Sequence, residues 1–267
     1  MYLRHAACLI SICLGVTAAK AEECHGHLDA LGTSRVIFVS PQKYRRIGNM
    51  EYKETLPLHD HEVVLTFDDG PSATYTPRVL DALAAECVKA TFFLVGSMAN
   101  EAPALVKRIH AEGHTIGTHT QHHQWLTRLP REAVKKEITE GIASVAAATG
   151  NPKAVAPFFR FPYFDHNKTV EEVVLSQGLV IWSVDFTADD WLRITPQRVL
   201  SVTLARLDQR RKGLIGFHDI QQRTALALPV LLRELKKREY HAVHAVPAGQ
   251  DEARSETQVE QLPGPAQ

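Results

Sequence analysis

Residues 62–71 read E-V-V-L-T-F-D-D-G-P, and this stretch decides how the rest of the chain is interpreted. The apolar run Val63-Val64-Leu65 predicts a strand over 62–67 that is buried on both faces. Two carboxylates, Asp68 and Asp69, follow at the strand end, and Gly70-Pro71 then predicts a turn. Two adjacent like charges repel each other unless a cation neutralises one of them. The stretch therefore predicts a cation site, although a turn capped by an aspartate side chain is the simpler alternative.

Strand and helix patterns alternate from this stretch to residue 246. The dipeptides Thr76-Pro77 and Thr195-Pro196 each predict a helix start, with threonine as N-cap and proline in the first turn. Strands that are apolar on both faces and joined by helices form parallel sheets. We therefore expect an α/β fold, and seven units favour a distorted or incomplete (β/α)7 barrel over an open sheet. The predicted strands are 62–67, 90–95, 115–120, 156–161, 179–185, 214–217 and 241–246; the predicted helices are 76–89, 103–112, 130–149, 170–177, 195–211 and 226–238.

The first 21 residues have the pattern of a signal peptide. Arg4 precedes a short apolar run over 6–16, and Ala19-Lys20-Ala21 fits a cleavage site after Ala21. The run is too short to span a bilayer as a helix. We expect a secreted or periplasmic protein without stable membrane insertion after cleavage; an uncleaved anchor or a buried helix is the alternative.

Three further segments complete the predicted organisation. Residues 22–61 form an N-terminal extension, with a strand-like piece at 35–39, that packs on the barrel. Residues 62–246 form the barrel domain itself. Residues 247–267 are rich in Glu, Gln, Pro and Ala and predict a disordered tail.

Charge and cysteine content restrict the class of protein. The 267 residues contain 30 basic and 30 acidic side chains, so net charge favours neither nucleic acid nor an anionic membrane as partner. We expect a monomer. Cleavage would leave Cys24 and Cys87, which either form a disulfide or remain free, with Cys87 as a buried thiol on a helix.

Chemically capable side chains stand at five of the seven predicted strand ends, where β/α barrels build their active sites. His119 and His123 are four residues apart, so on a helical turn both rings reach one ion. With one carboxylate they make a two-histidine, one-carboxylate site that suits Zn²⁺, with Co²⁺ or another first-row divalent ion as alternative. The strand-end residues are Asp68, Asp69, His119, His122, His123, Arg160, Pro162, Tyr163, Asp185, Asp189, Asp190, Trp191, His218 and Asp219.

Five motifs in this order resemble the polysaccharide deacetylases, which are the NodB-homology group or carbohydrate esterase family 4. The resemblance covers about 63–246 and implies a barrel of the NodB-homology type and an acetylated glycan as substrate. Residues 89–96, K-A-T-F-F-L-V-G, also resemble the second strand of the family. The motifs are T-F-D-D-G-P at 66–71, H-T-Q-H-H at 119–123, R-F-P-Y at 160–163, D-D-W at 189–191 and F-H-D at 217–219.

The resemblance implies a role for each matching residue. Asp68 would be the general base, and Asp69, His119 and His123 the metal ligands. His218 would be the general acid. Arg160 would orient Asp68, and Asp190 would tune His218. The main-chain N–H of Tyr163 would bind the oxyanion, and Trp191, Pro162 and Phe217 would contact substrate. His122 matches no ligand position and would be structural or substrate-lining.

Two departures from the family pattern affect these expectations. Thr187 stands where an aspartate is usual, and Asp185 stands two residues before it, so Asp185 is an alternative to Asp190 as the tuning acid. Gly216 replaces a leucine that lines the acetyl pocket. The pocket should then be roomier, or be filled by Phe217 or Leu214.

The sequence predicts a secreted, metal-dependent deacetylase that hydrolyses N-acetyl groups of amino-sugar glycans, such as peptidoglycan or chitin-like oligomers. An esterase acting on O-acetylated polysaccharide would use the same residues. A non-catalytic glycan-binding protein is a third hypothesis, which the intact base, ligands and acid disfavour.

Overall fold

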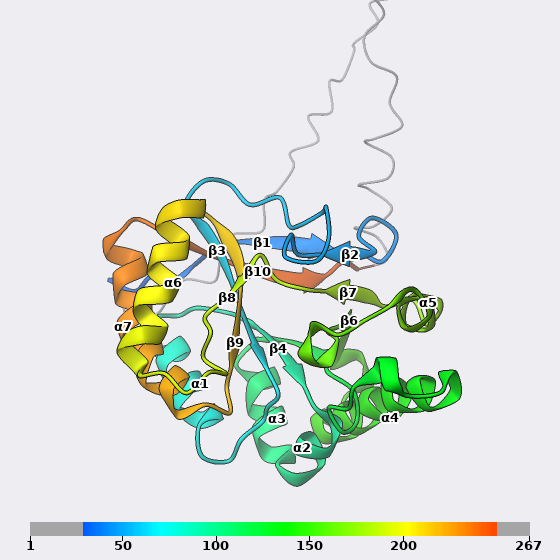
Figure 1. Ribbon diagram of the computed structural model, residues 1–267. Helices are drawn as coiled ribbons and strands as arrows, with labels where there is room; N and C mark the ends of the chain where they lie inside the picture. The colour runs from blue at the N-terminus through cyan, green and yellow to red at the C-terminus, as the bar shows by residue number, and fades with distance from the viewer. Residues whose placement is uncertain (1–28, 250–267) are drawn as a thin grey trace, which may run out of the picture.

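The structure is a computed structural model that describes residues 29–249, and its strands all pair in parallel (Figure 1). The strands are β1 (Thr33–Val39), β2 (Arg46–Ile47), β3 (Glu62–Asp68), β4 (Thr91–Leu94), β5 (Thr115–Thr118), β6 (Val155–Phe159), β7 (Val180–Trp182), β8 (Phe186–Thr187), β9 (Gly213–His218) and β10 (His241–Pro247). The helices are α1 (Thr76–Ala85), α2 (Gly96–Glu101), α3 (Pro103–Ala111), α4 (Arg131–Thr149), α5 (Lys168–Ser176), α6 (Pro196–Arg210) and α7 (Gln222–Lys237), with short 3-10 turns η1 (Leu126–Arg128), η2 (Pro152–Ala154) and η3 (Pro162–Phe164).

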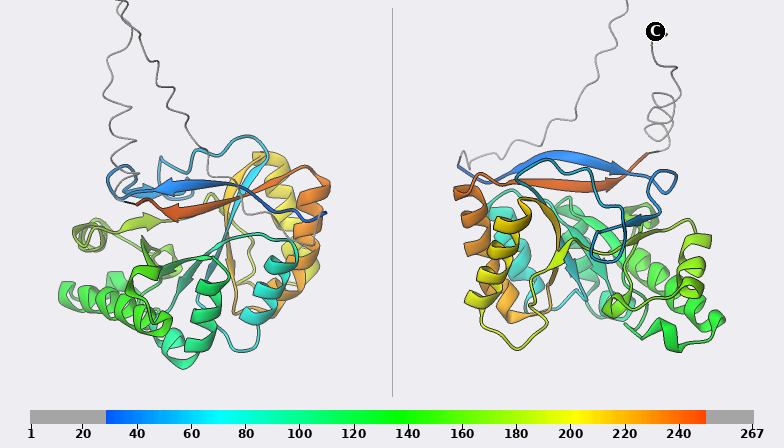
Figure 2. Two further views of the ribbon diagram at one scale, coloured as in Figure 1. Left: turned by 180° about the vertical axis from the view of Figure 1, so that it is seen from behind. Right: turned by 45° about the horizontal axis from the view of Figure 1, so that its top comes forward.

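Most of the strands form a distorted ring. The strands β3, β4, β5, β6 and β7 pair in sequence order, and β9 pairs with β3 on its other side. The predicted strand 179–185 is shorter in the structure: only β7 forms within it, and it pairs with β6. The chain bends over 183–185 and then forms β8, which pairs with β9. This bend closes the ring, with helices around its outside (Figures 1 and 2). The predicted α/β class and the distorted barrel are confirmed.

The last predicted strand lies largely outside this ring. β10 pairs with β3 only at Glu62 and Val63, and it pairs with β1 along its length. The two strands cross the end of the ring where its strands begin, as the hydroxyl of Thr115, the first residue of β5, donates to Ala245 O at 2.8 Å. Figure 2 shows this β1–β10 layer over the ring. At the opposite end, where the ring strands finish, loops follow the strands.

Alternation along β3 decides which side chains reach the interior of the ring. Leu65 and Phe67 pack outward against the helices, in a core cluster with Leu80 and Leu231. Val64 faces the opposite way. The same alternation places Asp68 on the inner face, at the end of a fully buried strand. Burying a large apolar side chain contributes about 1.5–3 kcal/mol, so the outer cluster fixes the strand that carries this carboxylate.

Several predicted helix ends differ from the structure. Thr76 is not an N-cap: α1 begins at Thr76, and its hydroxyl donates to Asp219 instead. Thr195 does cap α6, accepting from the backbone N–H of Arg198. The first helix ends at Ala85 rather than 89, before Cys87 takes a left-handed backbone. The last helix begins at Gln222 rather than 226.

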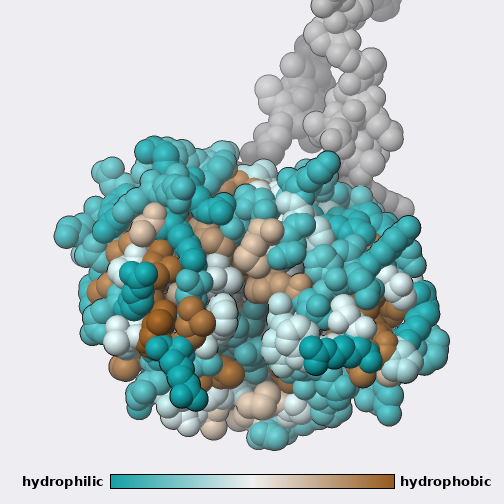
Figure 3. Space-filling view, in the orientation of Figure 1, coloured by the Kyte–Doolittle hydropathy of each residue, from teal (hydrophilic) through white to brown (hydrophobic). Residues whose placement is uncertain are grey.

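The predicted signal peptide and most of the predicted tail lie outside the described residues. Pro247, which we assigned to the tail, is the last residue of β10. Cys87 is half-buried and disulfide-bonded, so the free-thiol alternative is wrong; the proposed partner Cys24 lies outside the described residues. Within residues 29–249 none of the helices combines the length and apolar character of a membrane span. The face in Figure 3 is largely hydrophilic, with apolar side chains in small groups.

Candidate metal and catalytic site

A cavity of about 580 Å³ lies where the ring strands finish. Asp68 ends β3, Asp69 follows it, His119 follows β5, and His218 ends β9. Asp68 and His218 are register partners on neighbouring strands. The fold thus brings together Asp68 and His218, which lie 150 positions apart in sequence. The lining side chains are Met50, Asp68, Asp69, His119, His123, Trp125, Phe161, Tyr163, Phe164, Thr187, Trp191 and His218.

Asp69, His119 and His123 form a cluster suited to a metal ion. One ligand atom from each lies within 4.8 Å of the others. The Nε2 atoms of His119 and His123 lie 3.5 Å and 3.1 Å from Asp69 Oδ1. This oxygen is buried and accepts no hydrogen bond among residues 29–249. A buried carboxylate oxygen facing two imidazole nitrogens fits a divalent cation with open coordination positions.

The state of His119 suits metal binding. Its Nδ1 lies 2.7 Å from the carbonyl oxygen of Arg160, which can only accept, so Nδ1 carries the proton. The lone pair of Nε2 is then directed at the cluster. Burial lowers the pKa of His119 to about 4, so the ring is neutral near pH 7.

The spacing of His119 and His123 suggested a helical turn, but the two candidate ligands do not lie on one. Residues 119–125 form a loop without helix, and Thr120 and His123 have φ values of 67° and 54°. The ring centroids of His119 and His123 still lie 4.9 Å apart. The two rings therefore lie close together, as predicted, but a loop conformation rather than helix periodicity brings them together.

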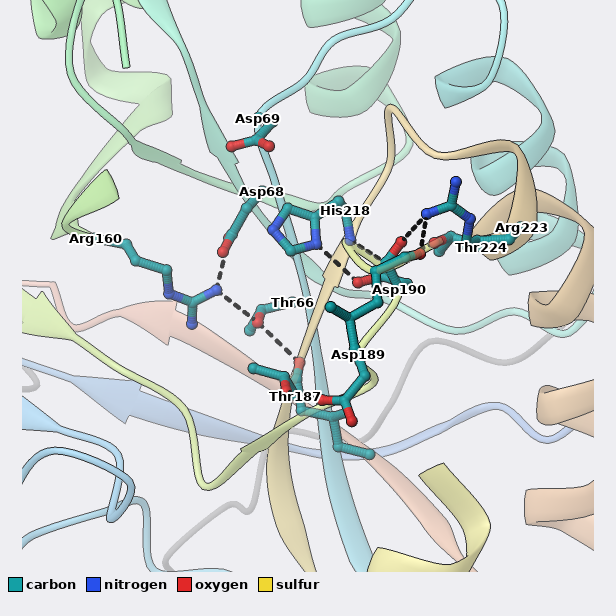
Figure 4. Close-up of polar contacts among 12 residues, drawn as sticks. Thr66, Asp68, Asp69, Arg160, Thr187, Asp189, Asp190, His218, Arg223 and Thr224 are labelled. Atoms are coloured by element: carbon teal, nitrogen blue, oxygen red, sulfur yellow. Dashed lines mark hydrogen bonds and ion pairs between the residues drawn. The ribbon is translucent and has the colours of Figure 1, made fainter. Parts of the chain in front are cut away.

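Asp68 is held by a buried arginine. Arg160 Nη1 donates to Asp68 Oδ1 at 2.6 Å and to Thr66 Oγ1 at 2.9 Å (Figure 4). Arg160 Nη2 donates to Ser183 O at 2.8 Å, and the guanidinium lies 4.1 Å from the ring centroid of Phe93. Both charged side chains are almost fully buried. Asp68 therefore stays fixed beside the cluster of Asp69, His119 and His123, in a position to accept a proton.

His218 lies on the other side of Asp68 and is paired with Asp190. Nδ1 of His218 lies 2.8 Å from Asp190 Oδ1, and the backbone N–H of His218 donates to Asp190 Oδ2 at 2.7 Å. Thr224 Oγ1 also donates to Oδ2 (Figure 4). Burial alone would lower the pKa of His218, but the charge and hydrogen bond of Asp190 outweigh it and raise the pKa to about 9. The ring is protonated near neutral pH.

The other aspartates of this region have different partners. Asp189 accepts two hydrogen bonds from the guanidinium of Arg206, at 2.7 and 2.9 Å. Asp185 accepts from the backbone N–H groups of Asn49 and Leu214. Between the two candidates left by the Thr187 departure, the structure thus places Asp190, and not Asp185, against His218.

The space next to Gly216 is filled by Val184, which the sequence did not indicate. A Cβ at Gly216 would lie 2.9 Å from Val184 Cγ1. Phe217 is buried and stacks on Phe67 with a centroid distance of 5.6 Å, and Leu214 is also in the core. Both the expectation that Phe217 or Leu214 fills this space and the assignment of Phe217 to substrate contact are therefore wrong. Pro162 is likewise buried and does not line the cavity.

Apolar side chains surround the mouth of the cavity. Trp125 and Tyr163 stack with centroids 4.0 Å apart and planes 7° apart, and the rings of Tyr163 and His123 make a T-shaped contact. Met50, Trp125, Tyr163 and Trp191 are between 37% and 57% exposed. Tyr163 and Trp191 were predicted from motifs. Trp125, two residues after a ligand, and Met50, in the extension, were not.

Comparison with known proteins identifies the family. Residues 56–182 match the polysaccharide deacetylase family. A chitooligosaccharide deacetylase of Sinorhizobium fredii is 35% identical over 175 residues, covering 64% of this chain and 79% of that protein. The chain belongs to the polysaccharide deacetylase family. This confirms the predicted family. The residues matched by the family model end at 182, before Asp190 and His218.

Further relatives agree with this assignment. The peptidoglycan-N-acetylglucosamine deacetylase PgdA of Listeria monocytogenes is 37% identical over 182 residues, which cover 68% of this chain and 37% of that protein. The chain thus spans well under half of that relative's length. A solved peptidoglycan deacetylase of Bdellovibrio bacteriovorus superposes with a TM-score of 0.71 at 30% identity, covering 81% of this chain and 59% of that one.

Proposed function

We propose that this protein is a metal-dependent deacetylase that hydrolyses N-acetyl groups of amino-sugar glycans. One observation carries the proposal. A buried, arginine-held carboxylate, Asp68, lies beside a three-residue cluster and beside a histidine, His218, whose pKa is raised to about 9. Amide hydrolysis needs a base for water and an acid for the leaving amine at the same time.

A divalent ion held by Asp69, His119 and His123, which we propose to be Zn²⁺ with Co²⁺ or another first-row ion as alternative, would polarise the acetyl carbonyl and acidify a water molecule. Asp68 then accepts the proton of the attacking water, and Arg160 keeps its carboxylate in place. The backbone N–H of Tyr163 donates to the oxyanion. His218 delivers its proton to the departing amine, and Asp190 stabilises the charged ring until that step.

The cavity mouth supports a sugar polymer as substrate. Exposed aromatic rings such as Trp125, Tyr163 and Trp191 offer flat apolar faces against which the C–H faces of sugar rings pack. The relatives named above act on peptidoglycan N-acetylglucosamine and on chitooligosaccharides. We propose these two glycan types as substrate classes, with no nucleic acid partner and a monomeric protein.

We also propose an exported location. The predicted cleavage after Ala21 would release the described part of the chain outside the cytoplasm. The disulfide at Cys87 supports an oxidising compartment, since such bonds are rare in the cytosol.

The test is acetate release from chitooligosaccharides, peptidoglycan and acetylated xylan, with zinc added and again after chelation. We expect chelator-sensitive release from the amino-sugar substrates and its loss in Asp68→Asn, with zinc still bound. The exposed Asp208 provides the matched control Asp208→Asn, which should retain full activity. Release from xylan alone would assign an O-acetyl esterase, and zinc binding without release from any substrate would favour a glycan-binding protein.

A further inference from the structure

The loop that carries His119 and His123 needs external support for its shape. It has no helix or strand, and two of its residues, Thr120 and His123, are left-handed although neither is glycine. Left-handed backbone is unfavourable for residues with a Cβ and persists where surrounding contacts impose it. Because His123 is one of these residues, the contacts that impose the loop shape also place a metal ligand.

Backbone hydrogen bonds hold the first part of the loop. Gly96 N–H donates to Thr120 O at 2.9 Å, and Ser97 N–H donates to Gln121 O at 2.9 Å. Within the loop, His123 N–H donates to Thr120 Oγ1 at 2.9 Å. None of these bonds reaches His122, the residue directly before the ligand.

His122 is held instead by one carboxylate of α4. Glu137 Oε2 accepts from the backbone N–H of His122 at 2.9 Å, and Oε1 lies 2.8 Å from His122 Nδ1. Glu137 is 7% exposed, and it lies between Val134 and Ile138, which are buried in the core. Burying a carboxylate costs free energy that apolar packing of the helix does not require. Both oxygens of this buried group contact the same loop residue.

We infer that Glu137 is a positioning residue of the metal site. By fixing both the backbone and the ring of His122, it sets the backbone direction into His123 and so the direction of His123 Nε2 toward Asp69. This inference rests on the proposed metal site. The role of Glu137 also explains why His122, which matches no ligand position, faces α4 rather than the cavity.

The test is zinc affinity, measured by competition with a chromophoric chelator. Loss of a direct hydrogen-bond partner of a metal ligand typically costs about 10- to 100-fold in metal affinity. Because Glu137 acts through His122, the neighbour of the ligand, we expect a loss of about 10-fold for Glu137→Ala. Glu137→Gln keeps the size of the side chain and one carbonyl acceptor for the His122 N–H. It should therefore recover most of the affinity. Glu140→Ala is the matched control, because Glu140 lies on the same helix and is exposed.

Two further measurements separate positioning from a general loss of fold. The visible spectrum of the Co²⁺-loaded protein reports ligand geometry and should change in Glu137→Ala but not in Glu140→Ala. Thermal unfolding of the metal-free variants shows which are folded. If Glu137→Ala is not, the ring-deleting His122→Ala decides instead, and it should weaken zinc binding measurably.

Folded variants that bind zinc like the wild type and keep its Co²⁺ spectrum would overturn the role of Glu137. A wild-type protein that binds no zinc would instead refute the metal site of the proposed function, and the inference with it. The two failures are therefore distinguished by the wild-type titration alone.

Discussion

Asp190, which is fully buried, and His218 form an ion pair at the edge of the cavity, with 2.8 Å between Asp190 Oδ1 and His218 Nδ1. Because this pair raises the pKa of His218 to about 9, the acid form persists through neutral pH. We predict that turnover falls on the alkaline side as His218 loses its proton, above the ordinary histidine pKa of about 6.5. In Asp190→Asn this limb should move to lower pH. The measurement is kcat against pH for both proteins; an unchanged limb would remove His218 as the acid.

The same pair predicts how the stability of the metal-free protein depends on pH. A group with a raised folded-state pKa stabilises the fold below its unfolded pKa, here about 6.5, and this contribution disappears as pH rises through the folded value. The stabilisation from His218 should therefore be complete below about pH 6.5 and decline toward pH 9. Urea unfolding of wild type and His218→Gln at several pH values tests this. The difference between the two proteins should shrink as pH rises.

Removing Arg160 should damage the fold as well as catalysis. Arg160→Met leaves Asp68 buried without its cationic partner, and breaking such a pair typically costs about 3–5 kcal/mol. We expect a lower urea midpoint and very low turnover. The double variant Arg160→Met/Asp68→Asn has no unpaired charge and should regain part of the stability but none of the activity. If the single variant is as stable as the wild type, the pair does not hold the site together.

The candidate site residues at the strand ends could largely be predicted from the sequence, because they directly follow buried strands with a recognisable apolar pattern. The β3 pattern located Asp68 and Asp69, and strand ends located His119 and His218. Because side chains alternate between the two faces of a strand, adjacent residues point in opposite directions. His218 faces the cavity, whereas Phe217 packs on Phe67 in the outer core. Applied to β9, that rule would have excluded Phe217 from substrate contact.

Other features depend on contacts between distant segments, which no local pattern encodes. The bend between β7 and β8 carries no glycine or proline; it is fixed where Asp185 accepts from Leu214 N–H and Asn49 N–H. Met50 reaches the cavity because its own N–H donates to Val184 O at 2.9 Å. Glu137 is recognisable only once α4 is packed beside the loop that it supports.

The stacked rings of Trp125 and Tyr163 at the cavity mouth predict that glycan binding can be weakened without slowing hydrolysis. Trp125→Ala removes the ring that lies 4.0 Å from Tyr163 and exposes less apolar surface to a sugar. An aromatic contact of this kind is worth about 0.5–1.5 kcal/mol, so KM for a chitooligosaccharide should rise by about 2- to 10-fold. Turnover of a small acetyl ester should not change. A proportional loss on both substrates would show that Trp125 supports the site rather than the glycan.

The contact between Val184 and Gly216 predicts a compensating pair of substitutions. Gly216→Leu introduces the leucine usual in the family, but its Cβ meets Val184 Cγ1 at 2.9 Å. Overpacking of this kind typically costs about 1–3 kcal/mol, and the single variant should unfold at a lower temperature. Shortening the neighbour in Val184→Ala/Gly216→Leu opens the required space and should restore the unfolding temperature in part. If the double variant is no more stable than Gly216→Leu, Val184 is not what occupies the position of the missing leucine.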